Sequence, residues 1–123
     1  MLSRLFSRRK SSPNVDLEAF RNAALVAWIK TVPSEERLAD FLKQVPNAMR
    51  DDVERSARAI FDAADRYLDE AAKQGEVDLE AFHPKLEEHL KSGFPWMTGP
   101  TFEALRSYTG WYAWHEGYVA SAR

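Results

Sequence analysis

Apolar residues recur every three to four positions through the middle of the chain, between residues 47 and 73. They form one stripe of a helical face, made up of Met49, Val53, Ala57, Ile60, Phe61, Ala64, Tyr67, Leu68 and Ala71. The opposite face holds charged pairs four positions apart: Asp51 with Arg55, Glu54 with Arg58, and Asp62 with Arg66. The pattern predicts a long amphipathic helix over 47–73 that covers a core with one face, is solvated on the other, and stops at Gly75.

Two helices are predicted before this one. Asp16 is suited to cap a first helix that runs to about Lys30, and the apolar stretch 23–29 at its centre predicts a buried position on nearly all sides. Pro33 and Ser34 end that helix and begin a second, which stops at Pro46. The apolar face of the second helix consists of Leu38, Phe41, Leu42 and Val45.

The hexapeptide Val-Asp-Leu-Glu-Ala-Phe occurs twice, at 15–20 and at 77–82. The residues that follow the two copies do not match, which favours two independent helix openers over a duplication. Pro84 lacks an amide hydrogen and disfavours helical backbone at His83. We therefore expect the second copy to form a short turn, followed by a helix over about 84–92 that ends at Gly93.

The last quarter of the chain concentrates its aromatic residues. Eight of the fifteen lie within 94–118: Phe94, Trp96, Phe102, Tyr108, Trp111, Tyr112, Trp114 and Tyr118. A helix from Pro100 onward spreads its aromatic and apolar side chains over about 240°, whereas a stripe of about 100° suffices to cover a core. Either this helix is central, with close backbone approach at Gly110 and Gly117, or part of its aromatic face meets a ligand or partner.

The loop at 94–100 precedes this helix and contains two prolines and three large apolar residues. It either plugs the end of the helical bundle or offers Trp96 and Met97 to a partner. Together these patterns predict an all-α fold: a compact bundle of four or five helices, with the proline- and aromatic-rich loop before the aromatic-rich C-terminal helix.

The length of 123 residues suits one domain, which we place at 14–123 after a basic segment at 1–13. Cysteine is absent from the sequence, so no disulfide framework or thiol nucleophile is expected, and a cytoplasmic location fits. The longest uncharged run in the first helix, 22–29, is too short to span a bilayer. No transmembrane segment is predicted.

Charge is unevenly distributed along the chain. The first thirteen residues carry four positive charges and no acid, and the rest holds 13 basic and 19 acidic residues. The acidic body excludes binding to duplex DNA, which needs a basic face. The segment 1–13 is expected to be a disordered tail. Alternatively, Leu2, Leu5 and Phe6 within residues 1–10 make weak contact with an anionic membrane surface.

Motifs of catalysis are scarce. Glu80 and His83 have the Glu-x-x-His spacing of di-iron bundles, but such sites need two of these motifs and two further glutamates. No metal or cofactor is therefore expected. We predict a non-enzymatic module that binds a protein partner, or its own copy, through region 94–118. The alternative is a small-molecule or catalytic pocket lined by Trp111, Tyr112, Trp114, His115 and Glu116.

Two charged residues fall among apolar positions on the helical wheels. Arg21 projects between apolar residues of the first helix, and Glu116 does so in the last. An unpaired buried ion is costly, so the pattern predicts that Arg21 and Glu116 meet, or that Tyr112 or His115 supplies the missing hydrogen bonds. The alternative is that Arg21 reaches solvent along its flexible stem.

Overall fold

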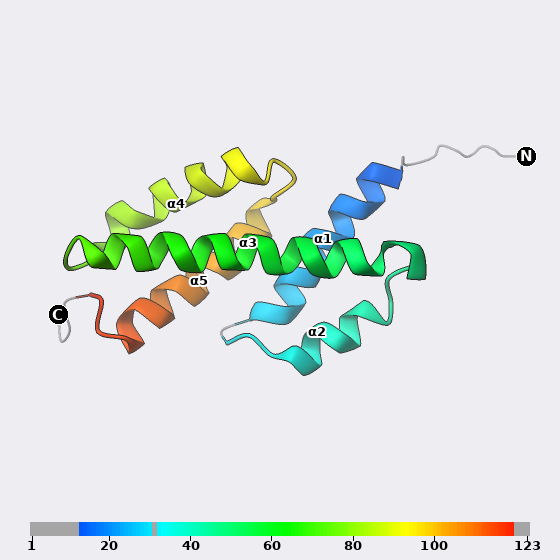
Figure 1. Ribbon diagram of the computed structural model, residues 1–123, viewed down its shortest axis with the longest axis horizontal. Helices are drawn as coiled ribbons and strands as arrows, with labels where there is room; N and C mark the ends of the chain where they lie inside the picture. The colour runs from blue at the N-terminus through cyan, green and yellow to red at the C-terminus, as the bar shows by residue number, and fades with distance from the viewer. Residues whose placement is uncertain (1–12, 31, 120–123) are drawn as a thin grey trace, which may run out of the picture.

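The computed structural model describes residues 13–30 and 32–119, and it contains five helices and no strand within them (Figure 1). The helices are α1 (Pro13–Ile29), α2 (Glu35–Leu42), α3 (Asn47–Lys73), α4 (Leu79–Gly93) and α5 (Gly99–His115). The predicted all-α bundle of four or five helices is confirmed. Residues 1–12, which make up nearly all of the predicted tail, lie outside the described part.

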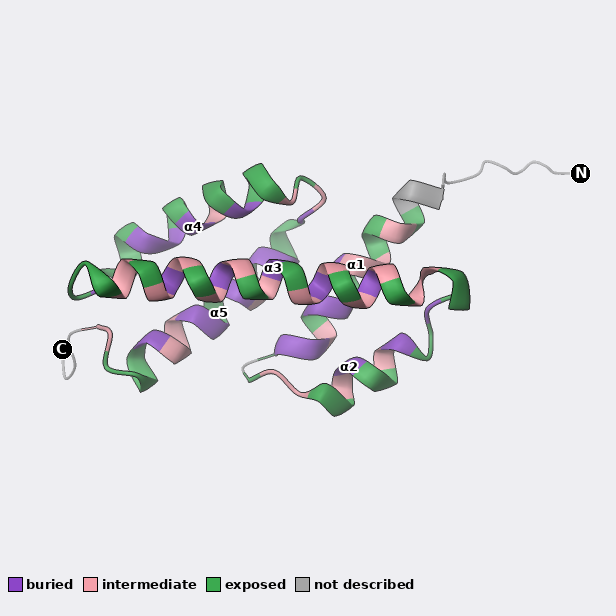
Figure 2. Cartoon of the chain, viewed as in Figure 1, coloured by how far each residue is buried: buried purple, intermediate pink, exposed green. Residues whose placement is uncertain are grey.

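The long helix α3 packs against all four other helices, and α1 packs against α2, α3 and α5. Figure 2 shows alternating buried and exposed bands along α3, as expected for an amphipathic cover. Its fully buried residues are Val53, Ala57, Ile60, Ala64 and Leu68. The outer face carries the predicted ion pairs of Arg58 with Glu54 (3.0 Å) and of Arg66 with Asp62 (2.5 Å). Arg55 differs, because its partner is Asp52 at 3.7 Å.

The junction of α1 and α2 is closed by one arginine. Ser34 caps α2 as predicted, with its Oγ accepting the amide hydrogen of Arg37 at 3.2 Å. The guanidinium of Arg37 reaches back to the end of α1 and donates to backbone carbonyls of Ala27 (3.1 Å), Trp28 (3.2 Å), Ile29 (3.2 Å) and Val32. The carbonyls of residues 27–29 have no partner within α1, so Arg37 caps the end of this helix, together with the amide of Ser34, which donates to the carbonyl of Trp28 at 3.0 Å.

The starts of two helices differ from prediction. Helix α1 begins at Pro13, three residues before the expected cap Asp16. Helix α4 begins at Leu79 and runs through Pro84, because Asp78 caps it and accepts the amide hydrogen of Glu80 at 3.1 Å. The missing amide of Pro84 removes only one helical hydrogen bond near the start of α4.

The expectation that α1 is buried on nearly all sides was also wrong. Ala24, Leu25, Trp28 and Ile29 are buried, but Ala23 is exposed and Val26 is 37% exposed. Three neighbouring helices cover one side of α1 and leave the other open. The apolar composition of its centre reflects small residues on the open side.

Candidate functional site

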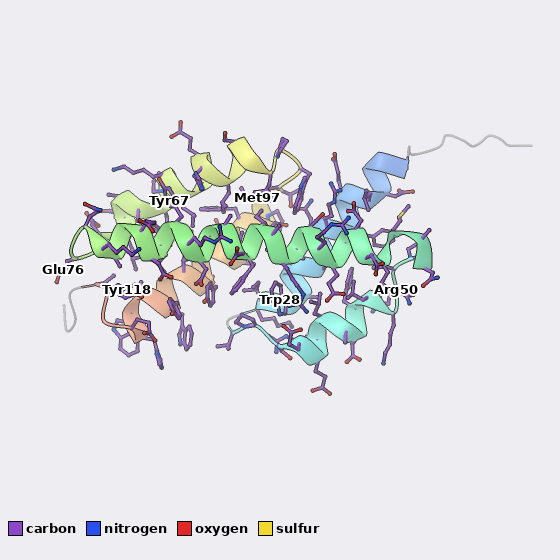
Figure 3. All side chains as sticks on the ribbon, in the orientation of Figure 1. Trp28, Arg50, Tyr67, Glu76, Met97 and Tyr118 are labelled. Carbon is purple, nitrogen blue, oxygen red and sulfur yellow. The ribbon has the colours of Figure 1, made fainter. Side chains whose placement is uncertain are left out.

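The loop before α5 fills a gap in the core. Met97 is only 7% exposed and belongs to the apolar core, and Figure 3 shows it beside the middle of α3. Trp96 is half-buried, with the guanidinium carbon of Arg21 5.6 Å from its ring centroid and the ring of Phe94 6.0 Å away. These contacts fit the interpretation of the loop as a plug, and Met97 has no surface to offer a partner.

Asn22 of α1 holds this loop and the start of α5 in place. Its Oδ1 accepts hydrogen bonds from the amide and hydroxyl of Thr98 (2.9 and 3.1 Å) and from the hydroxyl of Thr101 (2.5 Å). Its Nδ2 donates to the carbonyls of Glu18 (2.8 Å) and Trp96 (2.9 Å). Because these groups come from three separate segments, Asn22 fixes where α5 starts relative to α1. Sequence analysis did not identify this role, although a polar residue inside an apolar helix was a signal for it.

A chain of aromatic rings runs from α1 across α3 to the end of α5. The ring centroids of Trp28 and Phe61, and of Phe61 and Tyr108, are each 4.8 Å apart. Tyr108 stacks on Tyr112 at 5.6 Å, and Tyr112 meets Tyr118 edge to face at 6.0 Å. Such contacts restrain the rings and give the end of α5 a rigid backing.

Helix α5 ends at His115, before the aromatic stretch is complete. Gly117 adopts a left-handed backbone with φ +75°, and the amide of Tyr118 bonds the carbonyl of Ala113 at 2.8 Å. The carbonyl of Tyr118 then accepts the amide hydrogen of Val77 at 2.8 Å, which ties the chain to the α3–α4 loop. Gly117 therefore terminates the helix, and the expected close helix approach at this glycine was wrong.

The last turn of α5 presents aromatic residues to solvent. We call Trp111, Tyr112, Trp114, His115 and Tyr118 the α5 aromatic end. Trp114 is 64% exposed, the highest value among the exposed large apolar residues of the described chain. His115 is also exposed, with its ring 4.9 Å from that of half-buried Trp111. One surface thus combines a solvent-facing indole with rings that are held from behind.

The predicted pairing of Arg21 with Glu116 was wrong. Arg21 turns toward α3, where its Nε and a terminal nitrogen lie 2.9 and 2.8 Å from Asp52 Oδ1. Glu116 follows the end of α5 as an exposed residue, and its carboxylate lies 3.5 Å from Nδ1 of His115. The helical wheel had placed Glu116 on an apolar face because it assumed that the helix continued past His115.

Carboxylates of α3 line the inner side of the α5 aromatic end. The hydroxyl of Tyr108 donates to Asp65 at 3.1 Å, and that of Tyr118 donates to Asp69 at 3.2 Å. Burial raises the pKa of Asp65, and the negative charge of Asp69 adds to this rise. Burial and the bond to Asp69 raise the pKa of Tyr118 to about 12. Both tyrosines are therefore neutral hydrogen-bond donors near neutral pH.

His83, singled out by the Glu-x-x-His spacing, is buried between α4 and α5. Its Nε2 lies 3.0 Å from Thr109 Oγ1, whose hydroxyl donates to the carbonyl of Arg106 at 3.2 Å. Burial lowers the pKa of His83, and the positive charge of Arg106 lowers it further. Within residues 13–30 and 32–119, no three His, Cys, Asp or Glu side chains gather in a way that could hold a metal ion. His83 acts there as a neutral contact between two helices.

Comparison of the chain with family models, curated proteins and solved structures gives no match. Within the described part of the chain, no helix has the length and apolar character needed to cross a membrane. What this protein does must therefore be argued from its own surface.

Proposed function

We propose that this protein is a non-enzymatic module that binds a protein partner, or a second copy of itself, through the α5 aromatic end. The observation that carries this proposal is the 64% exposure of Trp114. An exposed indole costs hydration free energy in a monomer, and tryptophan is the residue most enriched at the energetic centres of protein interfaces. The proposal places the module in the cytoplasm, in keeping with the absence of cysteine.

The surroundings of Trp114 support a surface over an enclosed pocket. His115 and Glu116 are 57% and 41% exposed at their side chains, and they belong to the same turn. A binding pocket buries most of a small ligand, which requires walls on several sides. An open aromatic surface with a rigid backing is better suited to a broad partner, because fewer side chains must be ordered on binding.

The test compares three single substitutions. Trp114→Ala should change the free energy of unfolding by less than about 0.5 kcal/mol, because its side chain faces solvent. Trp111→Ala should cost about 2 kcal/mol, because it removes a half-buried ring that lies against Tyr108 and Tyr112. Val32→Ala is the matched control, since Val32 is 47% exposed but lies at the α1–α2 junction.

Binding is then measured by cross-linking in cells that make this protein, with quantitative mass spectrometry, and by sedimentation velocity for self-association. We expect Trp114→Ala to reduce the cross-linked partner at least tenfold, or to raise at least tenfold the dissociation constant of self-association through the α5 aromatic end, and Val32→Ala to leave both unchanged. If wild type, Trp114→Ala and Val32→Ala give the same partners and the same sedimentation, the α5 aromatic end is not a binding surface.

A further inference from the structure

A second surface lies between the end of α3 and the start of α4. The two helices and their connecting loop line an open groove of about 450 Å³, which lies within the size range of ligand-binding clefts. Its floor is apolar and consists of Tyr67, Ala71, Val77, Ala81 and Phe82. Its rim carries three carboxylates and one ammonium group, from Glu70, Glu76, Asp78 and Lys85, beside Gln74. We call this the α3–α4 groove.

The floor of the groove is held in shape by its neighbours. The ring of Tyr67 stacks on His89 at 4.4 Å and lies 5.7 Å from the ring of Phe82, which is itself buried. Val77 is fixed by the hydrogen bond from its amide to the carbonyl of Tyr118. A groove of this kind exists before anything binds, so a ligand does not have to order it.

The chemistry of the groove favours a basic segment with apolar anchors. Three acidic residues and one basic residue line its rim, with Glu70 already paired to Lys73 at 3.0 Å, and the apolar floor offers contact area that charged groups alone would not use. The chain itself contains such a segment. Residues 2–10 hold Leu2, Leu5 and Phe6 interleaved with Arg4, Arg8, Arg9 and Lys10, and contain no acid.

The arrangement of the helices places the far part of the groove, at Glu76, beyond the reach of this segment within one molecule, which favours a second copy as its source. Figures 1 and 3 show that α1 begins at one end of the molecule, whereas Glu76 and the α3–α4 loop lie at the other. Helix α3, with 27 residues, spans about 40 Å between these ends. Phe6 precedes Pro13 by seven residues, and an extended chain of that length covers at most about 25 Å.

We propose that the α3–α4 groove binds residues 2–10 of a second copy of this chain, with Leu5 and Phe6 on the apolar floor and the arginines near the rim carboxylates. This contact is separate from the α5 aromatic end and does not depend on the function proposed for it. Because donor and acceptor are different patches, two copies either exchange segments reciprocally or continue into longer assemblies.

Three variants of the full chain test this contact by sedimentation velocity, each made in a Trp114→Ala background so that association through the α5 aromatic end does not contribute. Ala81→Arg fills the groove at an exposed helical position and adds a positive charge. The double substitution Leu5→Ser with Phe6→Ser removes the anchors and leaves the groove intact. Ala39→Arg, at an exposed position of α2, is the control for adding an arginine to a helix surface.

We expect the Trp114→Ala parent and Ala39→Arg to self-associate, more weakly at high salt because the rim charges are exposed. Ala81→Arg and the double variant should each dissociate, with the dimer dissociation constant raised at least tenfold. Mixing these two variants should restore association, because one still supplies the segment and the other the groove. The mixture should stop at one-to-one pairs, since it contains a single working contact.

Several results would overturn the proposal. A Trp114→Ala parent that sediments as a monomer up to about 1 mM has no contact of useful strength. Variants that associate like this parent, or a mixture that stays monomeric, exclude the pairing of segment and groove. If the double variant still self-associates like the parent but no longer binds vesicles that contain anionic lipid, residues 2–10 bind a membrane surface instead of the groove. Trp114→Ala distinguishes the α3–α4 groove from the α5 aromatic end, because this substitution should not change the association that is restored when the two groove-contact variants are mixed.

Discussion

Replacing Asn22 by alanine removes the side chain that joins α1 to the start of α5. Five hydrogen bonds are lost, and the groups left behind differ in their access to water. Thr98 is exposed and can bind water, whereas Thr101 is fully buried and its hydroxyl would lose its shortest bond. With about 1 kcal/mol for a typical bond and up to about 3 kcal/mol for a buried group without a partner, we expect a loss of about 3 kcal/mol.

The free energy of unfolding is measured by urea titration with circular dichroism, and the melting temperature by a thermal scan. A loss of about 3 kcal/mol corresponds to a fall of about 12 °C for a domain of this size. Asn22→Asp should be at least as harmful, because its second oxygen would face the carbonyls of Glu18 and Trp96. Asn47→Ala, at the exposed first residue of α3, is the matched control and should shift stability by less than about 0.5 kcal/mol.

Equal effects of Asn22→Ala and Asn47→Ala on the free energy of unfolding would refute this expectation. That result would mean that the loop and α5 are held by apolar packing alone, and that water replaces Asn22 at little cost. Should Asn22→Asp match the wild type while Asn22→Ala does not, the donated bonds to Glu18 and Trp96 contribute nothing and only Oδ1 matters.

Two further predictions concern the helix junctions. Arg37→Met should lower the free energy of unfolding by about 2 to 3 kcal/mol in urea titration, because it removes the cap of α1. Arg66→Met, on the exposed face of α3, is the control and should have little effect. Equal effects of the two substitutions would show that water caps α1 adequately. Burial lowers the pKa of His83 in the folded state. The contribution of His83 to the free energy of unfolding is therefore complete above about pH 6.5, and it is lost as the pH falls from the unfolded pKa toward the folded one. Urea titrations at pH 8 and pH 5 should show this loss of stability in the wild type. The variant His83→Gln retains a donor for Thr109 and should lose less stability between the two pH values. An unchanged pH dependence in the variant would assign the effect to other groups.

The sequence determined those features that depend on neighbours a few residues apart. The span of α3, the face it buries and the cap at Ser34 follow from apolar spacing and from side-chain bonds within one helical turn. The plug was one of two alternatives that the prolines and large apolar residues of the loop at 94–100 offered. The aromatic character of α5 could be read directly from its composition.

The tertiary structure alone decided which sides of α1 and α5 are covered and which partners the charged and polar side chains find. Asp52 stands 31 residues after Arg21, and Thr98 and Thr101 stand 76 and 79 residues after Asn22, so no local pattern could pair them. The same holds for the candidate site: spacing could not separate half-buried Trp111 from exposed Trp114, because that difference arises from where α5 ends and which helices pack against it. Local propensity fixes the elements, whereas burial depends on contacts between residues far apart in the chain.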